Sequence, residues 1–132
     1  LISGLFCLTK KMYDEPTLFA QPWNFGPMID NENLTVSQLN SQIILEWGSG
    51  NYNNISEDEP HEANLLMLDS SKAVSKLNWH PVYSVKEAIS KTVTWYKEYF
   101  TNKDHMERFT QDQIIAYVEQ AKKINLDWAS KI

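Results

Sequence analysis

The chain has 132 residues, of which 42% are hydrophobic and 22% charged, as in an ordinary soluble domain. Twelve Lys and Arg against seventeen Asp and Glu give a formal net charge of -5. This balance argues against a nucleic-acid-binding protein, because such proteins present a basic face. The single cysteine, Cys7, cannot form an internal disulfide. There are only four glycines, whereas a dinucleotide-binding loop alone uses three.

The first eight residues are mostly apolar. This run is much shorter than the roughly 20 residues that cross a bilayer, and it lacks the basic lead-in of a signal peptide. We therefore expect no membrane segment and a location in the cytoplasm. The spacing of Leu5, Leu8 and Met12 predicts the end of an amphipathic helix, which Pro16 terminates. Because the chain opens directly on this run with Leu1, we expect it to be part of a longer protein.

The next segments predict short strands around one helix. Residues 19–27 have the pattern of a strand that runs into a Gly-Pro turn, and residues 51–56 and 65–68 have the pattern of two more. Thr35 and Gln38 form a capping box, in which the hydroxyl and the amide satisfy free backbone groups. The helix that follows is predicted to stop at Gly48. Asp69 is predicted to cap another helix, which ends at Leu77.

The second half of the chain predicts two long helices. Ser84 and Glu87 form a second capping box, and an apolar stripe continues from there to Phe100. A third box, from Thr110 to Gln113, predicts the start of the next helix. The final residues, 125–132, have little pattern and are expected to fray.

These elements predict a small α+β domain that is mostly helical, with two or three short strands. The domain spans residues 1–124, and residues 125–132 form a frayed tail.

Most motifs that could carry chemistry are explained better by structure. Tyr99 and Lys103 have the Tyr-x-x-x-Lys spacing of short-chain dehydrogenases, but many surface helices contain this spacing. His61 and Glu62 begin a metalloprotease-like motif that lacks its second His. No histidine or cysteine has metal-ligand spacing, so neither a metal nor a catalytic residue is predicted.

The loop over residues 59–64 is more informative. It joins an acidic stretch to an apolar one and brings together a His, a carboxylate and an amide: Pro60, His61, Glu62 and Asn64. Loops at the ends of strands often bind ligands on a rigid scaffold. A plain polar loop is the alternative interpretation.

Several segments together resemble a known family. Asp69-Ser70-Ser71-Lys72-Ala73, Leu77-Asn78-Trp79-His80-Pro81 and the helix that reaches Trp95-Tyr96 resemble the end of extended short-chain dehydrogenase/reductases that act on nucleotide sugars. Trp23-Asn24-Phe25-Gly26-Pro27 and Pro60-His61-Glu62-Ala63 are similar to the CDP-glucose 4,6-dehydratase branch, as are residues 91–97 and 109–114. Asn78 stands where the family has Gly, a mild change because Asn also adopts the left-handed conformation.

The resemblance implies that this chain is the C-terminal, substrate-binding lobe of an enzyme with an NAD-binding Rossmann domain elsewhere. That enzyme would convert CDP-glucose to CDP-4-keto-6-deoxyglucose as a homo-oligomer, and the lobe alone would be inactive. Pro60, His61, Glu62 and Asn64 would bind the substrate. Relatives that use thymidine sugars place an Arg before the Pro, and Glu59 stands there in this chain.

Two alternatives stay open: the substrate lobe of another nucleotide-sugar epimerase or dehydratase, and a free-standing interaction module with an aromatic-rich surface. Fold alone does not separate these from the dehydratase.

Overall fold

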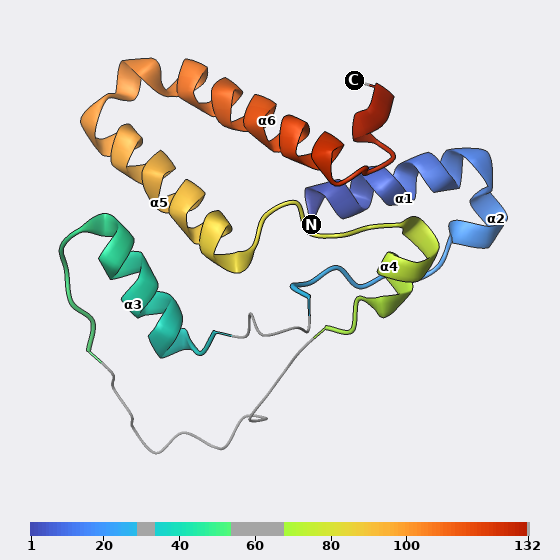
Figure 1. Ribbon diagram of the computed structural model, residues 1–132, viewed down its shortest axis with the longest axis horizontal. Coiled ribbons are helices and arrows are strands. Elements are labelled where there is room, and N and C mark those ends of the chain that lie inside the picture. The colour runs from blue at the N-terminus through green and yellow to red at the C-terminus, as the bar shows by residue number, and fades with distance from the viewer. Residues whose placement is uncertain (29–33, 54–67, 132) are drawn as a thin grey trace.

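The computed structural model describes residues 1–28, 34–53 and 68–131 (Figure 1). In chain order the helices are α1 (Ile2–Asp14), α2 (Pro16–Phe19), α3 (Val36–Trp47), α4 (Ser71–Leu77), α5 (Val85–Thr101) and α6 (Met106–Lys123), with the short 3-10 turns η1 (Lys103–His105) and η2 (Ala129–Lys131). Over these three ranges the structure contains no β-strand, so the predicted α+β class is wrong.

The predicted strand over residues 19–27 is an extended segment without a partner strand. Phe19 ends α2, and the extended chain that follows lacks an N–H group at Pro22 and at Pro27. The N–H of Gly26 donates to the Ser70 hydroxyl oxygen over 2.9 Å. The segment has no strand to pair with, so hydrogen bonds to side chains hold it in place.

The other two predicted strands cannot be assigned. Residues 51–53 and Leu68 have no regular structure. The rest of the expected strands, residues 54–56 and 65–67, lies outside the described residues.

Helix α1 forms and ends before Pro16 as predicted, but the predicted apolar side is not the buried one, because Leu5 and Met12 are 47% and 37% exposed. It buries Ser3, Gly4 and Cys7 on one side, and Pro16 begins α2 at a position where proline is tolerated. The opposite side exposes several large apolar residues: Leu1, Ile2, Leu5 and Phe6.

One core cluster joins α1, α2 and α4. Its buried members are Cys7, Phe19, Ala73, Leu77 and Trp79. Asn78 has φ 51° and ψ 37°, so it makes the left-handed cap of α4 that the sequence predicted. This turn places Trp79 in the core, where its side chain is 2% exposed.

Helices α5 and α6 form a hairpin, and α3 lies beside α5 (Figure 1). The capping boxes at Thr35–Gln38 and at Ser84–Glu87 are both confirmed. The third predicted box is wrong, because α6 already begins at Met106. Thr110 lies inside α6, and its hydroxyl accepts a hydrogen bond from Trp95 Nε1 over 2.9 Å, which joins the two helices.

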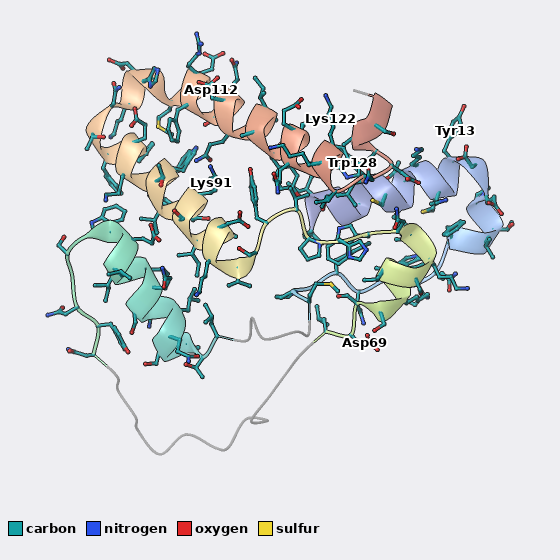
Figure 2. The ribbon with its side chains drawn as sticks, in the orientation of Figure 1. Tyr13, Asp69, Lys91, Asp112, Lys122 and Trp128 are labelled. Carbon is teal, nitrogen blue, oxygen red and sulfur yellow. The ribbon has the colours of Figure 1, made fainter. Side chains whose placement is uncertain are left out.

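The C-terminal segment packs against the rest of the fold, so the predicted fraying is wrong for its first residues. Leu126 and Ala129 are 0% exposed and form a second cluster with Val82 and Ala121. Trp128 lies where the chain after α6 meets α1 (Figure 2) and packs against both core clusters. Apolar side chains at these positions hold the segment, although the pattern is too short to have been predicted as a helix face.

None of the helices in the described ranges has both the length and the apolar character needed to span a bilayer.

The substitution Gly4→Ala tests the packing between α1 and Phe25. A Cβ atom at Gly4 would lie 2.3 Å from Phe25 Cδ1 and 2.8 Å from Phe25 Cγ, so the ring would have to move. Although Ala favours helix by about 1 kcal/mol over Gly, we expect Gly4→Ala to destabilise the chain by about 1–2 kcal/mol. Urea unfolding followed by circular dichroism measures this change in the free energy of unfolding.

A double-mutant cycle isolates the contact. In a Phe25→Leu background the smaller side chain leaves room for the methyl group, so Gly4→Ala should become neutral or stabilising there. Equal destabilisation in both backgrounds would show that the Phe25 ring does not limit this position.

Candidate functional site

The four residues predicted to bind a ligand, Pro60, His61, Glu62 and Asn64, lie outside the described residues. The structure therefore leaves their role as a prediction. It does describe the segment that begins four residues after Asn64, at Leu68, and the motifs around it.

The family-like motifs are close together in space. Lys72 Nζ donates to Gln21 Oε1 over 2.7 Å and to the Pro22 carbonyl oxygen over 2.9 Å. It also lies 4.5 Å from the centre of the Trp23 ring, within cation–π range. The Asp-Ser-Ser-Lys-Ala motif therefore fixes the start of the Trp-Asn-Phe-Gly-Pro motif.

The start of α4 fixes the rest of that motif. Ser70 is buried and accepts the hydrogen bond from Gly26 described above. Asp69 Oδ1 accepts from the Ser71 N–H over 2.8 Å, and Figure 2 shows Asp69 at the end of the segment that leads into α4. Hydrogen bonds from the Ser71 hydroxyl and N–H hold the pKa of Asp69 below its ordinary value. The predicted N-cap at Asp69 is therefore wrong by one residue: the N-cap of α4 is Ser70, and Asp69 accepts only from the N–H of Ser71.

A cavity of about 400 Å³ opens beside these motifs. Phe25, Gly26 and Pro27 line it from one motif, and Trp79 and Pro81 line it from another. The start of α5, the first residues of α1 and Tyr117 of α6 complete its walls. Cavities of this volume are typical of small-molecule sites. Sequence reasoning missed this cavity, because its walls come from four segments that are far apart in the chain.

The lining is mostly apolar and aromatic. The rings of Phe25 and Trp79 are 5.1 Å apart at 77°, and those of Tyr83 and Tyr117 are 5.3 Å apart at 78°. Such edge-to-face pairs are a favourable aromatic arrangement. Burial is the main cause that raises the pKa of Tyr83, and the nearby Tyr117 and Glu87 add to it.

Tyr99 and Lys103 do not form a dehydrogenase-like pair. The Tyr99 ring stacks on Trp95 with a 6° angle between planes, and Lys103 Nζ lies 5.2 Å from the centre of the Tyr99 ring. A catalytic Lys would have to approach the phenol oxygen, whereas this ammonium group lies over the ring.

Within the described ranges, the glycines do not offer the phosphate-binding turn that NAD, which the family resemblance implies for the whole enzyme, would require. The only closely spaced glycines, Gly48 and Gly50, follow the C-terminus of α3 with φ values of 88° and 121°. A dinucleotide phosphate binds at a helix N-terminus, where N–H groups are free, whereas this turn follows a helix end that presents carbonyl groups. Among the described residues, no three His, Cys, Asp or Glu side chains gather as a metal site would require.

Comparison with known proteins gives one informative relative. The chain is 34% identical over 104 residues to CDP-glucose 4,6-dehydratase of Salmonella typhimurium, a match that covers 78% of this chain and 29% of the relative. The resemblance inferred from the motifs is thereby confirmed: the chain is homologous to part of a CDP-glucose 4,6-dehydratase. No protein-family model matches the chain, and no solved structure matches it significantly.

The capping box formed by Ser84 and Glu87 predicts how the stability of the chain depends on pH. Glu87 Oε2 accepts from the Ser84 N–H and the Ser84 hydroxyl, each over 2.8 Å. The bond from the Ser84 N–H is the larger cause that holds the pKa of Glu87 below its ordinary value of 4.5. The folded chain therefore binds this proton less readily than the unfolded chain. The contribution of ionised Glu87 to the free energy of unfolding is fully present above pH 4.5. It is lost as the pH falls through the lowered pKa of Glu87 in the folded chain.

Glu87→Gln removes this titration while keeping an acceptor at the position. We expect the thermal midpoint of the variant to fall less steeply with acid than that of the parent chain, measured by circular dichroism. Ser84→Ala keeps the larger, backbone contribution, so it should lower the midpoint at every pH and change the slope less. An unchanged acid slope in Glu87→Gln would contradict the assignment.

Proposed function

We propose that this chain is the substrate-binding part of a CDP-glucose 4,6-dehydratase and that it binds CDP-glucose. The observation that carries the proposal is the 34% identity over 104 residues to the Salmonella typhimurium enzyme, whose name states the substrate. Because the chain spans only 29% of that enzyme's length, the remaining part would bind NAD and would contain the catalytic residues.

The described contacts support a binding role. Hydrogen bonds from Lys72 and Gly26 hold the two family-like motifs together, and they place Leu68 and Asp69 next to the extended segment. In the chain, Leu68 and Asp69 come shortly after Pro60, His61, Glu62 and Asn64. Binding residues commonly lie on loops next to a hydrogen-bonded scaffold of this kind.

The exposed face of α1 supports the proposal that further polypeptide belongs to the enzyme. Leu1 is 76% exposed, and Ile2, Leu5 and Phe6 are also exposed. Contiguous apolar surface of this kind generally marks a contact with another part of a protein. In the proposed enzyme, the part that binds the cofactor covers this face.

Binding is tested on the 132-residue chain by saturation-transfer NMR with CDP-glucose. We expect saturable binding that His61→Ala and Glu62→Ala weaken about tenfold or more, because the imidazole is proposed to donate to a phosphate oxygen and the carboxylate to accept from a sugar hydroxyl. His105→Ala and Glu107→Ala are matched controls at exposed positions around η1 and the start of α6.

Two outcomes count against the proposal. Absence of saturable CDP-glucose binding would contradict the binding role of the chain. Equal affinities for the loop variants and their controls would contradict the assignment of the site to Pro60, His61, Glu62 and Asn64. A chain that binds no CDP-glucose would favour the interaction module as the alternative.

A further inference from the structure

Helix α3 is attached to the rest of the described fold through one neighbour. Among the described elements it packs against α5, and Figure 1 shows it at the edge of the molecule, apart from α1 and α4. None of its 12 residues is buried, and neither core cluster in the described ranges contains a residue from it. Most helical stability in proteins comes from the packing of a buried apolar face, so α3 contributes little to the common core.

The contacts that hold α3 on α5 are polar or exposed. Glu46 Oε2 accepts from the Ser90 hydroxyl over 3.2 Å, and Lys97 Nζ donates to the Glu46 carbonyl oxygen over 3.1 Å. The Trp47 and Phe100 rings meet edge to face with their centres 6.1 Å apart, and Phe100 is 67% exposed. Because water competes for the hydrogen-bonding groups, each of these bonds adds only modestly to stability.

The same stretch of chain is held together internally. The capping box at Thr35 closes the start of α3, and Gly48 ends the helix with a left-handed φ of 88°. The chain then turns back, so that the Tyr52 hydroxyl lies 2.5 Å from the Ser37 hydroxyl in the first turn of the helix. Helix α3 and the segment after it therefore form one unit, residues 34–53.

We propose that residues 34–53 open as a unit: they separate from α5 while the core around Trp79 stays folded. Segments with few buried apolar contacts open at a lower free energy than the core, and the elements that move in binding are drawn from such segments. The proposal uses no residue of the predicted binding loop, so it does not depend on the proposed function. A failure of either proposal leaves the other intact.

Native-state hydrogen exchange of the ¹⁵N-labelled 132-residue chain measures this opening. Once separated from α5, a helix of this length is marginal in water, so its amides exchange. After correction for intrinsic rates, we expect the α3 amides to exchange about tenfold or more faster than those of Cys7 and Ala121, which lie in the two core clusters. Low concentrations of urea should accelerate the α3 amides less than the core amides, because local opening exposes less surface.

Variants at the docking contacts test how the unit is held. Lys97→Met and Ser90→Ala each remove one hydrogen bond to Glu46, so each should speed exchange of the α3 amides about 2- to 12-fold. Lys91→Met is the matched control for the first variant. It makes the same change at an exposed position of α5 next to α6, where the Lys91 carbonyl oxygen accepts from Gln113, and it should not speed α3 exchange.

A core variant separates local opening from global unfolding. Val82 lies in the second core cluster, so Val82→Ala should speed exchange of the core amides about tenfold or more. It should leave the α3 amides unchanged, because the core stays folded when the unit opens.

Three results would overturn the proposal. The first is exchange of the α3 amides no faster than that of the core amides. The second is equal acceleration of both sets in Val82→Ala, because α3 would then open only when the whole chain unfolds. The third is an equal effect of Lys97→Met and Lys91→Met on α3, because the unit would then not be docked through Glu46.

Discussion

Trp79 makes the interaction on which the rest of the described structure depends. Its indole N–H donates to the Ser3 hydroxyl oxygen over 3.0 Å, across 76 positions in the chain. Its ring meets Phe25 edge to face, and its backbone N–H donates to the Ala73 carbonyl oxygen over 3.3 Å. One side chain thus joins the start of α1, the extended segment and the end of α4. Aromatic burial supplies the driving force, and the buried hydrogen bond fixes the orientation.

The consequences extend to the proposed site. Because Phe25 packs on Trp79 and α1, the extended segment runs beside Ser70 and Lys72, where hydrogen bonds hold it. The same arrangement leaves the cavity between these segments and α5. The motifs shared with the nucleotide-sugar enzymes therefore have mainly structural roles in the described residues. They form the frame that follows the predicted binding loop, and the chemistry of the homologous enzyme would require more polypeptide than this chain.

The sequence predicted local features well and tertiary features poorly. The capping boxes at Thr35 and Ser84 were predictable because their partners lie three residues away. The strands were wrong because a strand needs a partner, and the extended chain around Gly26 pairs with a side chain. The box at Thr110 was wrong because α6 already begins at Met106, which leaves Thr110 inside the helix, where its hydroxyl accepts from Trp95. For the same reason, neither the Ser3–Trp79 bond nor the cavity could be found from local patterns.

The C-terminal residues and the family resemblance show the two limits of pattern reasoning. Leu126 and Ala129 are too short a pattern to predict burial, yet both are buried, because the turn in which the Leu126 N–H donates to the Ala121 carbonyl oxygen directs them into the core. The resemblance depended on ordered motifs rather than on periodicity, and the homologous relative confirmed it. The chemistry of the loop around His61 had already suggested a ligand site, and the resemblance added the expected ligand, a nucleotide sugar.

Mapping CDP-glucose by backbone chemical shifts in the ¹⁵N-labelled chain tests directly whether the chain binds the substrate at the loop. We expect saturable shifts in the amides of His61 and Glu62 and in the segment Leu68–Ser70. Residues on the exposed side of α6, such as Ile114 and Ile115, should not respond. Shifts that avoid the loop, or no saturable shift at all, would contradict the claim that this chain holds the substrate of a CDP-glucose 4,6-dehydratase.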